Sequence, residues 1–134
     1  MKKFVFLCTA LTVAACGGAK MPSNLNDEKV FFAFDSAEIT PEMAKDLQGQ
    51  SLYMKKHPDI NVTLEGHCDE RGSTEYNLAL GALRAGNAAH VMIKDGIEPS
   101  RIKTISYGKE RPQYFGTGEK VWSKNRNATT RVDK

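Results

Sequence analysis

Residues whose side chains can carry out chemistry are concentrated in one short run, from Gly66 to Gly72, which reads Gly-His-Cys-Asp-Glu-Arg-Gly. His67 and Cys68 are the types that form a base and nucleophile pair, but neighbours on a strand point to opposite faces and cannot pair. Neighbouring residues also rarely converge on one metal ion, and the sequence has no second cluster of histidine or cysteine to complete a metal site. We therefore expect no catalytic residue, no metal and no cofactor in this run.

Polar residues at helical spacing follow this run and favour binding of a ligand instead. Asn77, Gly81 and Arg84 fall at positions i, i+4 and i+7, which places them on one helical face with the glycine leaving room between the polar groups. The arginine has a planar fork suited to a carboxylate, and Asp69 in the preceding turn offers the opposite charge. A small zwitterion would suit this arrangement. A direct ion pair between Asp69 and Arg84 would explain the spacing equally well.

Alternation of apolar and polar residues predicts the elements that must position this run. In the first strand Val30, Phe32 and Phe34 alternate with two further apolar residues, so both faces are apolar. The full pattern predicts, in chain order, a strand at 30–34, a helix from Thr40-Pro41 to His57-Pro58, a strand from Ile60 to Gly66, a helix from Ser73 or Thr74 to Gly96, a strand at 102–107, a short helix at 122–127 and a strand at 129–132. This β-α-β-α-β-β order is typical of an α/β (α+β) sandwich, with one mixed sheet, helices packed on it and parallel pairing of the first strands.

The composition suits one compact domain and excludes one class of partner. The chain has 134 residues, of which 40% are hydrophobic and 26% charged. Its formal charge of +3 falls to +1 without residues 1–15, because these contain Lys2 and Lys3 but no acidic residue, which leaves 17 basic against 16 acidic side chains. A nearly neutral surface lacks the clustered basic face that nucleic acids require, so we expect no nucleic-acid partner.

The N-terminus has the pattern of an export signal. Two lysines are followed by an apolar run of 12 residues, from Phe4 to Ala15, which is shorter than the roughly 20 residues that a membrane span needs. The run ends in Leu-Thr-Val-Ala-Ala-Cys, which resembles the lipobox of bacterial lipoproteins and implies cleavage before Cys16 and acylation of that cysteine. The alternative is an ordinary signal peptide cut near Ala15.

Residues 17–29 are mostly small or polar, as in a flexible tether, and would span about 43 Å at about 3.3 Å per residue when fully extended. The predicted organisation is therefore a signal peptide at 1–15, a lipidated N-terminus and tether at 16–29, and a domain at 30–134. After cleavage and acylation only Cys68 remains free, so no internal disulfide can form, and burial of this thiol is favoured over cross-linking of two molecules.

Four stretches of the chain carry a resemblance to a known family. The longest, from Leu64 to Arg84, reads LEGHCDERGSTEYNLALGALR and is more discriminating than any short motif. The others are VFFAFDSAEI at 30–39, SYGKERP at 106–112 and SKNR at 123–126. Over residues 30–131 the chain resembles the OmpA-like peptidoglycan-binding domain family, and within it the peptidoglycan-associated lipoproteins (Pal) of Gram-negative bacteria.

The resemblance implies a binding site and a cellular role. In that family the acidic residue after Gly-His-x and the arginine fifteen positions later, here Asp69 and Arg84, hold the diaminopimelate residue of the peptidoglycan stem peptide. By the same carry-over Asp35 and Asn77 line the cleft, and Arg126 lies near it. The implied protein is not an enzyme. It is an outer-membrane lipoprotein that faces the periplasm, binds the wall non-covalently and works with the Tol system in envelope integrity and cell division.

Three departures from the family pattern keep a second hypothesis open. Ala82 and Leu83 stand where the family has glutamate and arginine, and Asn127 replaces a common second arginine. The predicted tether is also short. These differences favour, as the alternative, a structural lipoprotein that binds periplasmic partner proteins with weak or no wall binding. A wall-remodelling enzyme would need an activated nucleophile or a metal, which the sequence pattern does not supply.

Overall fold

The computed structural model describes residues 18–134 of the chain. The predicted signal peptide at 1–15 and the predicted lipidation site Cys16 lie outside the described residues. Within residues 18–134, no helix combines the length and the apolar composition that a membrane span requires.

Four strands and three α-helices follow one another in the predicted β-α-β-α-β-β order, which is thereby confirmed, with short helices before the last two strands. They are β1 (Lys29–Phe31), α1 (Pro41–Lys56), β2 (Val62–His67), α2 (Thr74–Lys94), a 3₁₀ turn η1 (Pro99–Arg101), β3 (Ile102–Gly108), α3 (Glu119–Asn125) and β4 (Asn127–Val132).

The predicted signals for the ends of the long helices are confirmed. Thr40 caps α1 by accepting a hydrogen bond at Oγ1 from the backbone N–H of Met43, and Pro41 is the first helical residue. Ser73 caps α2 in the same way, accepting from the N–H of Tyr76 at 3.1 Å. Gly96, with φ of 104°, follows the end of α2 in the left-handed conformation that favours glycine.

The strands form one mixed sheet in the order β1-β4-β2-β3, with β2 and β3 parallel. The predicted pairing of the first two strands is wrong, because β4 lies between β1 and β2 and is antiparallel to both. Strand β4 carries Thr129 and Thr130 at buried positions instead of a long apolar run. Thr130 is satisfied there because its hydroxyl donates to the Oε1 atom of buried Gln50 on α1. Because the buried side chains of β4 are polar, its sequence lacks the apolar run that would predict a position in the middle of the sheet.

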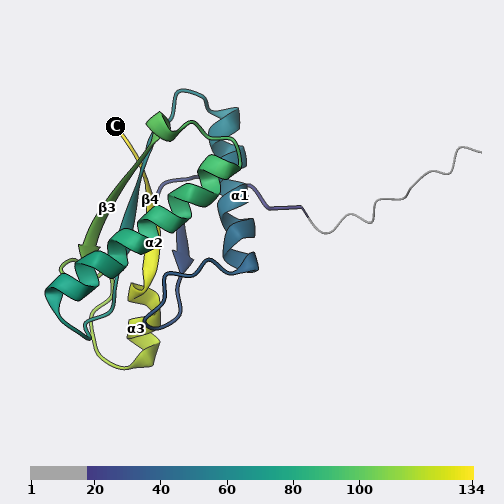
Figure 1. Ribbon diagram of the computed structural model, residues 1–134. Coiled ribbons are helices and arrows are strands. Elements are labelled where there is room, and N and C mark those ends of the chain that lie inside the picture. Colours follow the sequence, from purple (N-terminus) through teal and green to yellow (C-terminus); the bar gives the residue numbers. More distant parts are fainter. Residues whose placement is uncertain (1–17) are drawn as a thin grey trace, which may run out of the picture.

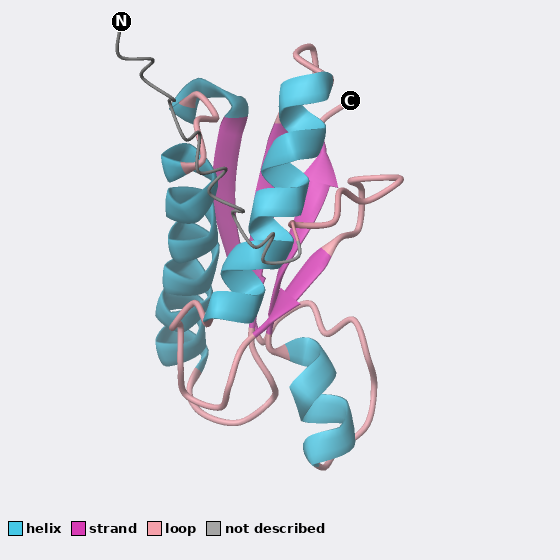
Figure 2. Cartoon of the chain, turned by 90° about the vertical axis from the view of Figure 1, so that its right-hand side faces the viewer, coloured by secondary structure: helices cyan, strands magenta, loops and turns pink. Residues whose placement is uncertain are grey.

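Helices α1 and α2 lie side by side on one face of the sheet (Figures 1 and 2). Between them and the sheet lies a single apolar core made of Leu25, Val30, Phe32, Met43, Leu47, Met54, Val62, Leu64, Ala85, Ala88, Ala89, Met92, Ile97 and Ala128. The side chain of Phe31 on β1 is 49% exposed, so the second apolar face of the first strand is only partly covered. Only the helix-facing side of this short edge strand is buried.

The N-terminal segment packs on the domain before residue 30, which shortens the expected flexible tether. Leu25 is fully buried in the core. The backbone N–H of Asp27 donates to Thr130 O, and the N–H of Thr130 donates to Glu28 O, each at 2.8 Å, so the pairing with β4 continues ahead of β1. Buried apolar area and ladder hydrogen bonds together hold this segment in place.

Candidate functional site

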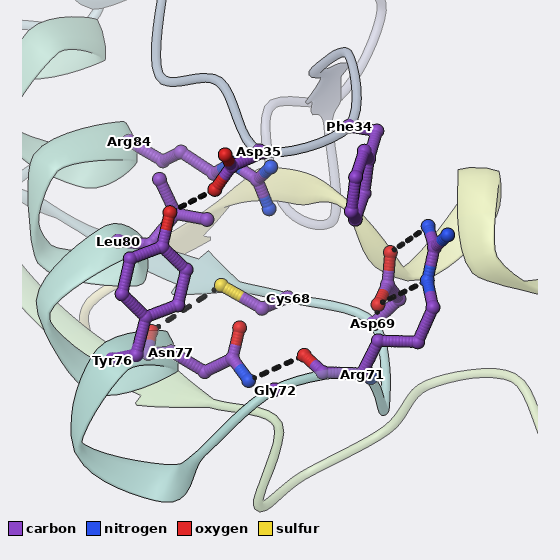
Figure 3. A pocket seen from close by; sticks show the side chains of 10 residues that line it. All are labelled: Phe34, Asp35, Cys68, Asp69, Arg71, Gly72, Tyr76, Asn77, Leu80 and Arg84. Atoms are coloured by element: carbon purple, nitrogen blue, oxygen red, sulfur yellow. Dashed lines mark hydrogen bonds and ion pairs between the residues drawn. The ribbon is translucent and has the colours of Figure 1, made fainter.

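A pocket of about 400 Å³ opens where three segments meet at one end of the sheet (Figure 3). The loop after β1, the loop after β2 and the first three turns of α2 each supply part of its wall. The lining residues are Phe34, Asp35, Cys68, Asp69, Arg71, Gly72, Tyr76, Asn77, Leu80 and Arg84. Four of the five ligand-binding residues predicted from the sequence, Asp35, Asp69, Asn77 and Arg84, are therefore brought together here.

Asp69 is a buried carboxylate held by cations within the protein. Its Oδ1 accepts hydrogen bonds from the backbone N–H and the Nε of Arg71, and its Oδ2 accepts from Nη2 of the same residue at 2.8 Å. Arg126 Nη1 lies 3.5 Å from Oδ2 on the other side. Burial alone would raise the pKa of Asp69, but the hydrogen bonds and charge of Arg71, with the charge of Arg126, outweigh it and lower the pKa. Asp69 is therefore ionised at neutral pH.

Arg71 is the residue at this site that the sequence reasoning missed. Its guanidinium carbon lies 4.0 Å from the ring centre of Phe34 and 4.0 Å from that of Trp122, between two aromatic residues from distant segments. The Asp69 carboxylate raises the pKa of Arg71 through a hydrogen bond and its charge. The spacing of residues 69 and 71 permits this pair, but nothing in the sequence places the two rings around it.

Arg84 is fully buried and binds backbone instead of Asp69. Its Nε donates to Ser36 O at 2.8 Å, its Nη1 to His67 O at 2.9 Å and its Nη2 to Ala33 O at 3.1 Å. These bonds hold the loop after β1 against the end of β2. No ion pair joins Arg84 to Asp69 within residues 18–134, so the alternative in which the two simply neutralise each other is not supported.

The charge of Arg84 is nevertheless presented to the pocket that it lines. Its three hydrogen bonds to backbone carbonyls use three of the five guanidinium N–H donors, and the Cys68 thiol lies next to the guanidinium. Burial lowers the pKa of Arg84 from its high ordinary value, with the Asp69 charge opposing this effect. In Figure 3 the guanidinium lies on the opposite side of the pocket from the pair of Asp69 and Arg71.

Asp35 adds a second, exposed carboxylate at the rim. Its φ of 53° is a left-handed conformation that is uncommon outside glycine, and it turns the loop between Phe34 and Ser36. The hydroxyl of Tyr76 donates to Asp35 Oδ1 across the mouth of the pocket (Figure 3). The backbone bonds of Arg84 to Ala33 and Ser36 flank this position, so one buried cation sets the geometry of the loop.

Asn77 lines the pocket but uses its amide N–H groups to hold the neighbouring loop. Its Nδ2 donates to Arg71 O at 2.8 Å and to Ser73 O at 3.0 Å. This leaves the amide oxygen as the group that a ligand could use.

Gly81 has a different role from the predicted one. A Cβ atom on Gly81 would lie too close to Ser106 Oγ, and one on Gly66 would overlap the backbone of Gly81. The two glycines therefore let α2 approach β2 and β3 closely, and they make no space for a ligand. Asn77, Gly81 and Arg84 do share one buried helical face, but that face is turned toward the sheet.

Arg126 lies behind the pocket and is not among its lining residues. Its Nε donates to Phe32 O at 3.0 Å, and its two Nη atoms donate to the carboxylate of Glu119. The hydrogen bond from Arg126 lowers the pKa of Glu119. Arg126 therefore contacts the lining of the pocket through Asp69, which it supports electrostatically.

His67 and Cys68 contact different parts of the protein, as neighbours on a strand are expected to do. His67 packs against Tyr107 and lies 3.4 Å from Glu65 Oε1, and burial lowers its pKa although the glutamate acts in the opposite direction. Cys68 is buried, donates to Asn77 O at 3.3 Å and has a pKa raised by burial. Within residues 18–134, no group of three histidine, cysteine or acidic side chains is arranged to hold a metal ion.

The residues that depart from the family pattern do not line the pocket. Leu83 is 58% exposed, and Ala82 is exposed beside it. Asn127 is buried, where its Nδ2 donates to Gln113 Oε1 and Lys124 O and its Oδ1 accepts from Thr129. These three positions therefore leave the composition of the pocket unchanged.

Comparisons with known proteins place the chain in a family. A family model described as the OmpA family matches residues 31–126. The peptidoglycan-associated lipoprotein of Agrobacterium fabrum is 41% identical over 118 residues, which cover 87% of this chain and 67% of the relative.

Solved structures share the fold. The peptidoglycan-associated lipoprotein from Burkholderia pseudomallei superposes with a TM-score of 0.76 at 34% identity, covering 80% of this chain and 91% of that structure. The C-terminal domain of Helicobacter pylori MotB, at 20% identity and a TM-score of 0.75, covers 80% of this chain and 84% of that structure and shares the fold. By sequence and by structure, the chain belongs to the OmpA family.

Proposed function

We propose that this protein is a lipid-anchored outer-membrane lipoprotein whose pocket binds the diaminopimelate residue of the peptidoglycan stem peptide and so ties the outer membrane to the wall. The observation that carries the proposal is the placement of Asp69 and Arg84 on opposite sides of one pocket of about 400 Å³. The free end of diaminopimelate has an ammonium and a carboxylate. A pocket with one anionic and one cationic side matches such a zwitterion.

On the anionic side, the ligand ammonium would approach Asp69, with Asp35 close to the mouth. Asp69 already accepts hydrogen bonds from Arg71, which is one-third exposed at its side chain and rests between Phe34 and Trp122. The ammonium must therefore share or replace the contacts of a partly exposed cation. Replacing Arg71 by the ligand ammonium costs less free energy than leaving the buried carboxylate of Asp69 unpaired, because a cation stays next to the carboxylate throughout.

On the cationic side, the ligand carboxylate would accept hydrogen bonds from the two N–H groups of Arg84 that bind no backbone carbonyl. Leu80 and Cys68 supply apolar wall between the two charged sides, which suits the methylene chain of the ligand. Every step is non-covalent binding, so we propose a binding protein and not an enzyme.

The cellular role follows from joining this pocket to the predicted acylation of Cys16. The domain would face the periplasm from the inner leaflet of the outer membrane. Many such weak contacts on one wall polymer give avidity without tight binding at any single site. The proposed role in envelope integrity and cell division includes contact with periplasmic proteins of the Tol system.

The test is co-sedimentation with purified sacculi, with and without free diaminopimelate as competitor. We expect the unmutated protein to pellet and the competitor to release it. The variant Asp69→Asn is expected to stay in the supernatant, while Asp59→Asn, the same change at an exposed position after α1, pellets normally. Sedimentation that resists the competitor, or that survives in Asp69→Asn, would contradict the proposed site.

The alternative of a partner-binding lipoprotein without wall binding rested on Ala82, Leu83 and Asn127. Because none of the three lines the pocket, no observation favours it over wall binding. Failure of the unmutated protein to pellet, together with capture of a Tol-type periplasmic protein, would revive it.

A further inference from the structure

The N-terminal strap, defined as residues 20–28, runs over α1 and joins the sheet ahead of β1. Its first residue contacts the helix closely, because a Cβ atom on Gly49 would lie 2.1 Å from Lys20 O. Only glycine leaves space for this contact, and glycine is otherwise unfavourable inside a helix. Its second half is held by buried Leu25 and by the hydrogen bonds of Asp27 and Glu28 to Thr130.

The strap leaves very little free chain before the predicted lipid attachment. From Cys16 to Lys20 there are four residues, which span at most about 13 Å at about 3.3 Å per residue. A tether free up to Lys29 would have spanned about 43 Å. The surface of α1 around Gly49, which Lys20 contacts, therefore lies close to the acylated residue, with at most about 13 Å of chain between Lys20 and Cys16.

The side chains around this contact suit a lipid headgroup surface. Lys45, Leu52 and Lys56 lie at helical spacing from Gly49 and are exposed, as is Lys20 on the strap. Acidic side chains are also present, because Asp46 and Glu28 line a hollow together with Lys20, and Glu42 is exposed one turn before Lys45 and Asp46. Lysines next to a membrane are attracted to lipid phosphates, and an exposed leucine can enter the interfacial region.

We propose that the face of α1 around Gly49 docks on the lipid headgroups of the membrane that carries the acylated Cys16. The proposal rests on the proposed acylation, and it adds an orientation for the domain. Figure 1 shows the strap leaving the domain across the middle of α1, whereas α3 and the loops of the pocket lie at one end of the molecule. The docked domain therefore keeps the pocket open to the periplasm, and the wall must come close to the membrane to reach it.

The test measures which face of the domain lies near the lipid. Full-length acylated protein with a single added cysteine, Lys45→Cys on α1 or Lys103→Cys on the opposite edge strand β3, is labelled with a fluorophore; Cys68 is buried. Liposomes carry phosphatidylcholine with a nitroxide on its headgroup. We expect the label at position 45 to be quenched at least about threefold more strongly than the label at position 103.

Two further variants test whether the short connection to the lipid and the contact of the strap with α1 orient the domain. Insertion of ten glycine and serine residues after Gly18, or Gly49→Leu to displace Lys20, should bring the quenching at the two positions to similar values. Equal quenching at both positions in the unmodified, liposome-bound protein would overturn the docking proposal alone. Failure of the protein to float with liposomes would overturn the acylation and the docking together.

Discussion

The two sides of the pocket hold their charges in opposite ways. On one side, Asp69 is held mainly by the side chain of Arg71, which is partly exposed. On the other side, Arg84 is held by three backbone carbonyls, two from the loop after β1 and one from the end of β2, and is completely buried. The first arrangement can exchange its partner for a ligand, and the second cannot change without altering the fold. A carboxylate and an arginine that look equivalent in the sequence therefore differ in what their loss should cost.

The largest expected effect is the loss of stability in Arg84→Ala. This change leaves the carbonyls of Ala33, Ser36 and His67 without their donor, and hydrogen bonds to a charged group contribute about 1.5–3 kcal/mol each. We expect the free energy of unfolding to fall by about 3–5 kcal/mol in urea denaturation. Arg111→Ala, at an exposed arginine stacked on Tyr107, should unfold near the native midpoint. A folded, stable Arg84→Ala protein would contradict the structural role.

The next effect is on binding, in Asp69→Asn. The variant keeps the shape of the side chain and removes the charge that an ammonium needs, so affinity for a soluble stem peptide measured by calorimetry should fall about 10- to 100-fold. Its stability should fall much less than that of Arg84→Ala. Because the folded pKa of Asp69 is lowered, its contribution to stability is present above the ordinary carboxyl pKa and is lost as the pH falls through the folded value. The stability difference between Asp69→Asn and the unmutated protein should vanish there, and a difference that persists would contradict this assignment.

The third expected effect is a pH dependence of stability caused by His67. The backbone carbonyl of His67 accepts a hydrogen bond from Arg84, and burial lowers the pKa of the His67 imidazole. Below about pH 6.5 the unfolded chain takes up a proton that the folded protein refuses, so stability should fall with pH by at most about 1.4 kcal/mol per pH unit. The slope should be shallower in His67→Gln than in the unmutated protein. Equal slopes in the two proteins would show that His67 is not kept neutral by the fold.

The smallest expected effect is in Arg71→Gln. This change removes a partly exposed cation, so the pKa of Asp69 should rise because its main hydrogen-bond donor is gone, and the urea midpoint at neutral pH should fall modestly as the linked consequence. Titration of the Asp69 carboxyl carbon by NMR measures this shift. Arg111→Gln serves as the control. A pKa of Asp69 that stays at its native value would mean that Arg126 alone holds the carboxylate.

Local signals in the sequence predicted the elements and four of the residues that line the pocket. Caps such as Thr40 and Ser73 depend on neighbours a few residues away, and the motif around Asp69 carries its own turn. The interior place of β4 could not be predicted, because its buried threonines are satisfied by Gln50 and other distant residues. The same holds for Arg71, whose aromatic neighbours come from residues 34 and 122.

The roles of single residues were harder to predict than their positions. Arg84 was expected to present an open fork to a ligand, but the fold uses three of its donors first. Gly81 was expected to leave room for a ligand, but it serves the contact between α2 and Gly66. Spacing along a helix shows which residues share a face, and only the packed structure shows what that face contacts.

The most direct test of the central claim is an NMR titration of the isotopically labelled protein with free diaminopimelate. We expect backbone shifts confined to the pocket, at Asp35, Asp69, Arg71 and Asn77, together with shifts of the Arg84 side-chain N–H signals. Lys103 on the far edge strand should not respond. Saturating diaminopimelate without any shift at Asp69 and Arg84, or with shifts centred elsewhere on the sheet, would contradict the account.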